Sequence, residues 1–306
     1  MSSQREDSIP HELRTAAEPR QNRLYPVRLS HVEQVNSSVR LLQFAIPPQE
    51  SSDTQQPFSF LPGQWLDVHI PSISQAGGFT ITSTPADAQL LPPLDSPQGP
   101  MASEEADIAI ASQGRAPYVE LAVQESPSNP SAAWLWKPKE DILGEEINIR
   151  VGGSFVWPPT GVDLHVVQNV VFIAGGVGIN RLPTGFETAS FQAVLEQVLF
   201  LSRLRQIIRT QLHLQKFNMS LQLFLTNLKS SLIEPSSSPA DLAIHSRRIG
   251  EDDLRAAITD RDGKTNPQKT VSYVCGPPDM TDEMVDRLKK VLDDPEGQRI
   301  FYEKWW

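Results

Sequence analysis

The sequence contains a single cysteine, Cys275, among its 306 residues. One cysteine excludes an internal disulfide and cysteine-rich metal sites, and it is typical of a protein in a reducing compartment. The six histidines show no ligand spacing. We therefore predict no metal site.

Positive charge is also scarce, since 27 Lys and Arg stand against 37 Asp and Glu and the net charge is −10. Without a basic stripe and interleaved aromatics, a nucleic-acid partner is excluded. No apolar run approaches the ~20 residues of a membrane span, so we predict none. Residues 1–23 mix arginines with acidic residues and lack an apolar core. They predict a polar, disordered tail rather than a leader peptide.

The chain is 39% hydrophobic and 21% charged, and it is long enough for two domains. Residues 24–160 contain short alternating segments bounded by Pro, Gly, Asn and Ser, which predict strands. These segments are YPVRLSHVEQV, VRLLQFAI, QWLDVHI, GFTITST, DIAIAS, YVELAVQ and EEINIRV. Six or seven such strands indicate an antiparallel barrel or sandwich.

The pattern changes over residues 166–306, where apolar strands alternate with helical spacing. VVFIAGG, MSLQLFLTN, TVSYVCG and RIFYEKW are predicted strands, and EDDLRAAI, PDMTDEMVDRLKKVLDD and the stripe at 191–212 are predicted helices. Such alternation indicates a parallel sheet with helices on its faces. We thus predict a two-domain α+β protein with a boundary near 160–168.

Two of these strands end in glycine turns. AGGVG closes the first, where backbone N–H groups can approach a pyrophosphate. Its spacing is not G-x-G-x-x-G, so a tight packing turn explains it equally well. Cys275, Gly276 and Pro277 end the other strand. The cysteine is either a small buried residue or a neighbour of a reacting ring.

Five segments, GGFTITSTP, GEEINIRVGG, VVFIAGGVGIN, YVCGPPDMTD and FYEKWW, occur in this order along the chain. Over 24–306 they resemble the ferredoxin-NADP reductase-like flavoprotein family, and within it the oxidoreductase NAD-binding domain-containing protein 1 group. The resemblance implies an FR-type FAD-binding β-barrel followed by an α/β NAD(P)-binding domain. It also implies hydride transfer from NAD(P)H to FAD and onward to an unknown electron acceptor. By resemblance the protein is mitochondrial, with a cytoplasmic location as the alternative.

The family's flavin motif Arg-x-Tyr-Ser falls on Gly77 to Thr80. By resemblance, Phe79 stacks on the isoalloxazine, and the hydroxyl of Thr80 donates to its reactive edge. Gly77 replaces the arginine that pairs with a flavin phosphate, and glycine cannot supply that contact. Arg115 and Arg150 are candidate substitutes.

A helix start in SNPSAAW occupies the position of the family's second flavin element. Asn129, Ser131 and Ala132 are its candidate pyrophosphate residues, acting mainly through backbone N–H groups. A Ser or Asn before a helix is also simply a good cap, so both interpretations stay open.

On the nicotinamide side the resemblance places Cys275 near the carbon that gives up hydride. Glu303 is the C-terminal carboxylate that orients the nicotinamide or relays a proton, and Trp305 is the aromatic that shields the flavin. The remaining candidate residues for binding nicotinamide dinucleotide are Gly175, Gly176, Val177, Gly178, Asn180, Gly276 and Pro277.

Residues 181–190 do not match the family, in which Gly-Ile-Asn runs directly into a helix and then a second parallel strand. We therefore predict that the α/β domain lacks one helix and one strand, which leaves an unpaired strand edge. Either a truncated gene model or a genuine, catalytically impaired product would explain this. The second explanation, together with Gly77, gives an alternative function: a scaffold or interaction protein on the same fold. The sequence does not predict whether NADH or NADPH binds, because the family distinguishes them at the end of the strand that is predicted to be missing.

Overall fold

The computed structural model describes residues 10–35, 37–47, 57–90, 116–175, 188–195, 218–225, 242–259 and 263–304. The chain divides into two units, Met1–Ser154 and Phe155–Trp306. The division precedes the predicted boundary at 160–168, because Phe155 and Trp157 pack on Tyr273 of the second unit. Their ring centroids lie 5.2 and 6.2 Å from that of Tyr273.

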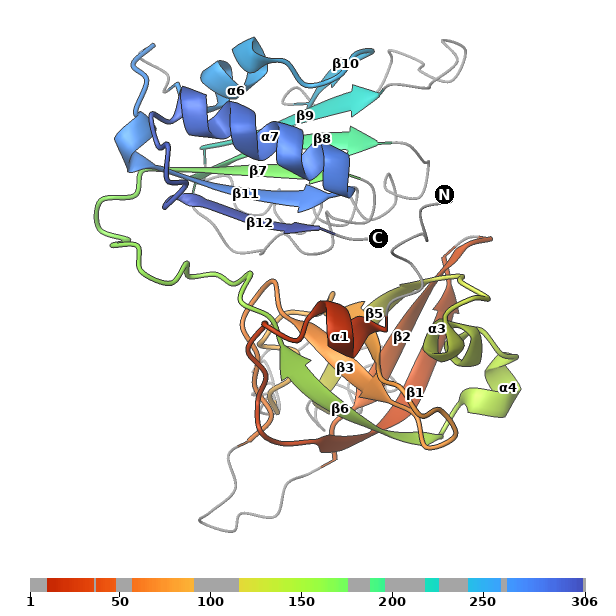
Figure 1. Ribbon diagram of the computed structural model, residues 1–306. Helices are drawn as coiled ribbons and strands as arrows, with labels where there is room; N and C mark the ends of the chain where they lie inside the picture. The colour runs from red at the N-terminus through yellow and green to blue at the C-terminus, as the bar shows by residue number, and fades with distance from the viewer. Residues whose placement is uncertain are drawn as a thin grey trace, which may run out of the picture. The chain divides into compact units, whose positions relative to one another are not determined.

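An antiparallel sheet forms the first unit (Figure 1). Its strands are β1 (Tyr25–Gln34), β2 (Val39–Ala45), β3 (Trp65–His69), β4 (Gly77–Thr80), β5 (Tyr118–Gln124) and β6 (Glu146–Gly152), in the order β4-β3-β6-β1-β2-β5. An Ile81–Leu121 bridge and a 2.8 Å hydrogen bond from Thr82 N to Glu120 O join the two outer strands. The sheet therefore closes on itself, and the predicted antiparallel barrel is confirmed.

Alternation of side chains explains the strands of the barrel. In β5, Val119, Leu121 and Val123 are each 0% exposed, and the residues between them are partly exposed. This period of two puts one face of the strand in the core. Two short helices, α3 (Pro130–Leu135) and α4 (Lys139–Ile142), follow β5.

The N-terminal segment differs from the prediction. Residues 10–23 are not a disordered tail, because they begin with helix α1 (His11–Arg14) and then run along β6. Gln21 N donates to Val151 O at 2.9 Å, and Gly153 N donates to Pro19 O at 3.0 Å. The segment is held because His11 and Arg20 contact a buried carboxylate in the barrel.

A parallel sheet forms the second unit. Among the residues described, its strands are β7 (Asn169–Gly175), β8 (Thr188–Leu195), β9 (Asn218–Leu225), β10 (Leu242–His245), β11 (Thr270–Gly276) and β12 (Ile300–Lys304). Their order is β10-β9-β8-β7-β11-β12, and every pair is parallel. With the barrel, this sheet confirms the two-domain α+β class.

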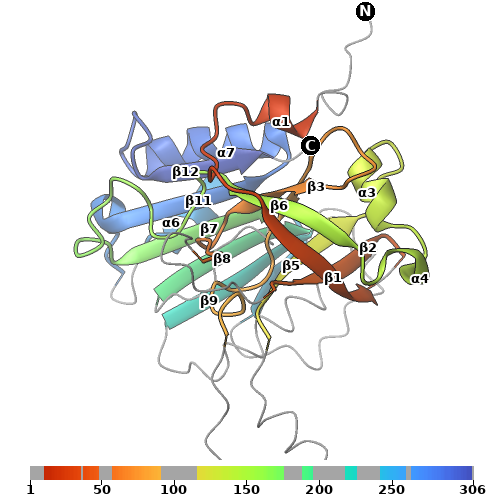
Figure 2. The same ribbon diagram turned by 90° about the horizontal axis from the view of Figure 1, so that it is seen from below.

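In the part of this unit that the structure describes, helices α6 (Glu251–Ala257) and α7 (Pro278–Val291) pack on the sheet. Figure 2 shows α7 along β11 and β12. Four buried residues of α7, Met284, Val285, Leu288 and Val291, follow helical spacing and belong to one core with strands β7 and β11. A short 3-10 helix, Pro267–Lys269, precedes β11.

The segment after β7 also differs from the prediction. Residues 188–195 form strand β8, whereas a helix was predicted from Phe191. β8 pairs with β7 over Val171↔Ser190 to Gly175↔Val194 and with β9 on its other side. The predicted unpaired edge is therefore wrong, because β8 occupies it. A short apolar run does not distinguish helix from strand, and neighbouring strands decide the outcome here. Residues 181–187 and 196–212 lie outside the described residues.

Of the helices described, none is long and apolar enough to cross a membrane. Within the same residues, no cluster of His, Cys, Asp and Glu has the arrangement of a metal site.

Candidate cofactor sites

Strand β4 meets the start of α3 at Gly77. A Cβ built on Gly77 would lie 2.5 Å from Ser131 Cβ and 2.6 Å from Phe79 Cε2. Real Cβ atoms do not approach so closely, so any larger residue requires a shift of its neighbours. Glycine therefore fits this position, whereas the Cβ of any other residue would clash with Ser131 and Phe79.

Phe79 lies on the same face of β4 as Gly77, since residues two apart in a strand share a face. Its side chain is 9% exposed and belongs to the barrel core. The ring therefore presents little area to a second ring. Thr80, the next residue, is only partly buried.

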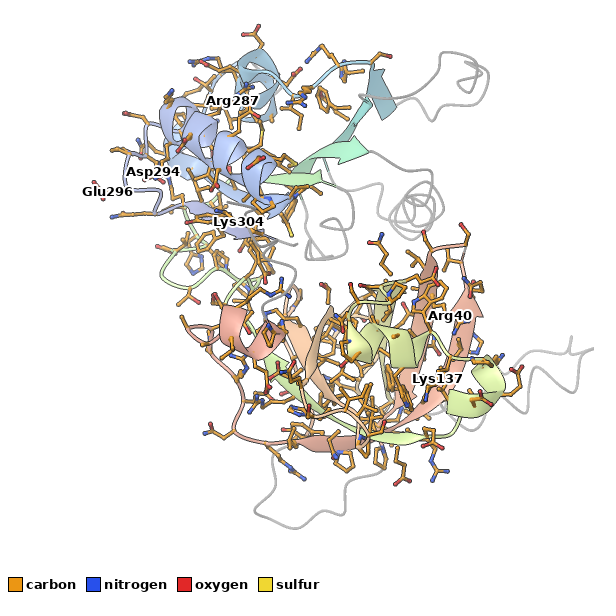
Figure 3. All side chains as sticks on the ribbon, turned by 45° about the vertical axis from the view of Figure 1, so that its right-hand side comes forward. Arg40, Lys137, Arg287, Asp294, Glu296 and Lys304 are labelled. Atoms are coloured by element: carbon orange, nitrogen blue, oxygen red, sulfur yellow. The ribbon has the colours of Figure 1, made fainter. Side chains whose placement is uncertain are left out.

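Helix α3 is fixed at both ends. Asn129 Oδ1 accepts hydrogen bonds from Ser131 N at 3.1 Å and Ala132 N at 3.2 Å, which is the geometry of an N-cap. At the other end, Arg40 Nη1 donates to Lys137 O at 2.7 Å (Figure 3). The two amides predicted to hold a pyrophosphate thus already have an acceptor within the chain.

A buried carboxylate in β3 organises the opposite side of β4. Asp67 is 0% exposed, and its Oδ2 accepts hydrogen bonds from Arg20 Nε at 2.9 Å and Arg150 Nη2 at 2.7 Å. His11 Nε2 lies 3.1 Å from Asp67 Oδ1. Burial would raise the pKa of Asp67, but the close His11 ring and the hydrogen bonds from Arg20 and Arg150 outweigh it and hold that pKa well below its usual range.

This network bears on the predicted substitute cations. Arg150 pairs with Asp67, so its guanidinium is engaged inside the barrel wall. Arg115 lies outside the described residues. Sequence reasoning missed Asp67 as an organising residue, although a charged residue in the middle of the apolar segment QWLDVHI is a signal of a paired buried charge.

The position of the His11 ring explains why residue 78 is a glycine. A Cβ on Gly78 would lie 2.1 Å from the His11 ring, which also packs edge-on against Trp65 with centroids 4.6 Å apart. Arg20 covers the same indole, with its guanidinium carbon 4.8 Å from the ring centroid. The N-terminal segment therefore packs against strands β3 and β4 through His11 and Arg20.

In the second unit, Cys275 and Glu303 lie side by side near the carboxyl ends of their strands. Cys275 of β11 is the register partner of Glu303 of β12 and of Ala174 of β7. The thiol is fully buried, and Glu303 is partly buried. The parallel register thus brings together the two catalytic candidates from this half of the sequence.

A row of aromatic residues lies on the same face of the sheet, two residues before Ala174, Cys275 and Glu303 in their strands. Phe172, Tyr273 and Phe301 are register partners, and the Tyr273 ring centroid lies 5.4 Å from that of Phe172 and 5.2 Å from that of Phe301. The row places three rings beside the Ala174, Cys275 and Glu303 positions. It gives these positions a rigid, apolar neighbour.

The strand-end glycines have a packing role. A Cβ on Gly175 or Gly276 would lie 2.4 or 2.8 Å from Met280 Sδ in the first turn of α7. The turn is further tied by Thr281, whose Oγ1 donates to Gly276 O at 3.1 Å and whose N donates to Pro277 O at 2.9 Å. The remaining candidates Gly176, Val177, Gly178, Asn180 and Trp305 lie outside the described residues.

Comparison with curated proteins identifies the family. The chain is 30% identical to the oxidoreductase NAD-binding domain-containing protein 1 of Xenopus laevis, over 100% of this chain and 86% of that protein. The chain belongs to this family. Its Danio rerio member is 27% identical over 97% of both chains, and the human member is 28% identical over 97% of this chain and 84% of that protein. No protein-family model matches.

Solved structures agree on the fold. A ferredoxin NADP+ reductase from Neisseria gonorrhoeae with bound FAD and NADP has a TM-score of 0.57 and 14% identity, over 94% of this chain and 100% of that chain. The cytochrome b5 reductase domain of Ulva prolifera nitrate reductase has a TM-score of 0.55 and 13% identity, over 92% of this chain and 97% of that chain. This chain therefore has the fold of these reductases, and the predicted resemblance to the ferredoxin-NADP reductase-like family is confirmed.

Proposed function

We propose that the protein is a flavin-dependent oxidoreductase that takes hydride from NAD(P)H onto FAD and passes electrons to an acceptor. The observation that carries the proposal is the pairing of Cys275 with Glu303 at the end of adjacent parallel strands. Membership in a family named for oxidoreductase NAD-binding domains supports it. So does the fold shared with a reductase that binds FAD and NADP.

The residues of the second unit fit a nicotinamide ring. Ala174 and Cys275 are small, buried residues beside the row of aromatics, and we propose that the nicotinamide ring binds next to them. In this proposal the Glu303 carboxylate, beside Cys275 in the sheet, orients the ring's carboxamide or holds a proton. Hydride acceptance and electron release would be the chemistry of bound FAD.

The barrel residues fit FAD in part. Thr80 is accessible enough to contact a flavin edge, and we retain Phe79, Asn129, Ser131 and Ala132 as candidates for its ring and phosphates. The cation for the phosphate is the difficulty. Glycine at position 77 supplies none, even a Cβ there would clash with its neighbours, and Arg150 is engaged by Asp67.

The missing cation for the flavin phosphate favours a second function. Phe79 is packed into the core over Gly77, and the first amides of α3 are already capped by Asn129. A barrel with a filled phosphate position suits a scaffold or interaction protein that keeps the reductase fold without its chemistry. We carry this as the alternative.

Titration of the purified chain with FAD separates the two functions. A flavin enzyme is expected to quench the fluorescence of added FAD, and Thr80→Val is expected to leave binding intact while slowing reduction by NADH. Thr84→Val is the matched control, because that hydroxyl donates to Asp87 in an exposed turn. Unchanged FAD fluorescence at saturating additions would reject the enzyme and leave the scaffold.

A further inference from the structure

Strand β3 turns two large side chains away from the core of the barrel. Leu66 and Val68 belong to that core, and Trp65 and Asp67 alternate with them along the strand. Trp65 and Asp67 are nevertheless 0% exposed. They are therefore buried on the outer face of the sheet, by a part of the chain other than the barrel core.

The N-terminal segment, residues 10–23, covers this pair. The His11 ring packs edge-on against the Trp65 indole, and the Arg20 guanidinium lies over the same indole. Both side chains also reach the Asp67 carboxylate, with His11 Nε2 at 3.1 Å from Oδ1 and Arg20 Nε at 2.9 Å from Oδ2. One imidazole ring and one guanidinium of the segment thus contact one indole and one carboxylate of the barrel.

Backbone pairing and a second charge contact add to this fit. Arg20 forms a β-bridge with Gly152 at the end of β6. Glu12 Oε1 lies 3.7 Å from Nη2 of Arg150, which itself pairs with Asp67. Proteins that bind extended peptides use main-chain pairing for affinity and side-chain contacts for specificity. The segment therefore contacts the barrel in the manner of a bound peptide.

The barrel core does not depend on the segment. The core cluster begins at Tyr25 and contains no residue of 10–23. Helix α1 has no buried residue, and its Leu13 is 68% exposed. Release of the segment would return Asp67 and Arg20 to water instead of leaving either charge buried alone, which is the costly case. The core can therefore persist when the segment leaves.

We propose that Trp65, Asp67 and Arg150 form a peptide-binding site on the outer face of the barrel, with the N-terminal segment as its resident, releasable ligand. The ligand class is a basic peptide that carries an aromatic or imidazole ring and a guanidinium. A ligand on a short tether acts at an effective concentration on the order of 1 mM, so one of only micromolar affinity stays docked. The proposal does not depend on any bound cofactor.

A spin label on the segment reports its release in the full chain. Leu13 is exposed and Cys275 is buried, so Leu13→Cys provides one reactive thiol. We expect an immobilised spectrum from this labelled chain. A synthetic peptide of residues 10–23 is then added as a competitor. At about 1 mM peptide, which matches the effective concentration of the tethered segment, about half of the label should become mobile.

Variants of the peptide test whether release is specific. Leu13→Ala changes an exposed side chain of α1, so this peptide should compete as well as the natural one. A peptide that carries both His11→Ala and Arg20→Ala should need about tenfold more for the same release, because it lacks both contacts to Asp67. Equal release by these two peptides, or a label that stays immobilised at every peptide concentration, would overturn the proposal.

A change in the barrel gives an independent result without added peptide. Asp67→Asn in the labelled chain should raise the mobile fraction about tenfold, because it removes the charge that both cations contact. Glu146→Gln, which alters an exposed pair with Arg28, is the matched control and should leave the spectrum unchanged. If Asp67→Asn fails to fold, Arg20→Ala in the segment decides. A label that stays immobilised in Arg20→Ala would reject the site.

Discussion

The barrel and the parallel sheet treat their predicted cofactor positions differently. Around Gly77 in the barrel, Phe79 and Ser131 lie so close that even a Cβ atom at this position would clash. In the sheet, Cys275 lies between Ala174 and Glu303 on the neighbouring strands. These two small residues and the carboxylate lie beside the row of aromatic residues. The predicted nicotinamide positions thus bring two small residues and a carboxylate into register, whereas the predicted flavin-phosphate position is crowded by neighbouring side chains.

The difference shows that a fold can persist while one of its sites changes. The barrel closes and buries its core through strand alternation, which does not depend on the identity of residue 77. Cofactor affinity, by contrast, depends on single side chains that contact charged groups. Membership in the family therefore carries the architecture further than it carries the chemistry.

Removal of the Asp67 carboxylate is the strongest way to perturb the barrel alone. Asp67→Ala leaves Arg20 and Arg150 without their buried partner, and we expect a loss of about 3 kcal/mol in the barrel's free energy of unfolding. Amide hydrogen exchange, read separately in β3 and β11, checks this. Glu146→Ala, which breaks an exposed pair, is the control. A loss spread equally over both units would contradict the comparison.

Filling the space at Gly77 should be next in size. Gly77→Ala places a methyl group against Ser131 and Phe79, and we expect a cost of about 2 kcal/mol from overpacking. Ser131→Gly removes two of the three clashing atoms, Ser131 Cβ and Oγ, so the double variant should be more stable than the sum of the two single effects predicts. Urea unfolding of all three variants measures this coupling, and strictly additive effects would show that position 77 is not crowded.

We expect acid pH to destabilise the barrel before it destabilises the parallel sheet, because the barrel contains the buried Asp67 carboxylate. The pKa of Asp67 in the folded protein is below its unfolded value of about 3.9, so the network's stabilisation is complete above that pH. It is lost progressively as the pH falls below about 4, because the unfolded state then takes up a proton that the folded state refuses. Unfolding midpoints measured between neutral and acid pH should fall steeply in wild type. Asp67→Asn should flatten that dependence, and parallel curves would refute it.

The smallest effect on stability is expected on the nicotinamide side. Glu303→Gln keeps the shape of a partly buried side chain, so the free energy of unfolding should change by less than about 0.5 kcal/mol. If Glu303 orients the nicotinamide or holds a proton, the rate of flavin reduction by NADH should nevertheless fall about tenfold. Stopped-flow absorbance at the flavin band checks this, and an unchanged rate would remove Glu303 from the site.

The sequence was sufficient for elements with an unambiguous period. β7 is an unbroken apolar run, and α7 repeats its buried residues Met284, Val285, Leu288 and Val291 at helical spacing, so both were predicted correctly. β8 was missed because its apolar residues fit both periods, and pairing with β7 and β9 settles its conformation.

Interactions between distant residues set the other limit. Arg20 and Arg150 reach Asp67 from positions 47 and 83 residues away, so local pattern could not reveal the network or the docking of residues 10–23. The crowding at Gly77 depends in the same way on Ser131. The family resemblance named Cys275 and Glu303 separately, and the adjacency of β11 and β12 that pairs them was found only in the structure. A mitochondrial location stays a prediction.

The visible spectrum of the purified protein, recorded anaerobically before and after addition of NADH, tests the oxidoreductase proposal most directly. We expect a protein supplied with FAD to retain yellow flavin absorbance after gel filtration and to lose it when NADH is added. A colourless protein after gel filtration, or bound flavin that NADH does not bleach, would contradict the proposed hydride transfer.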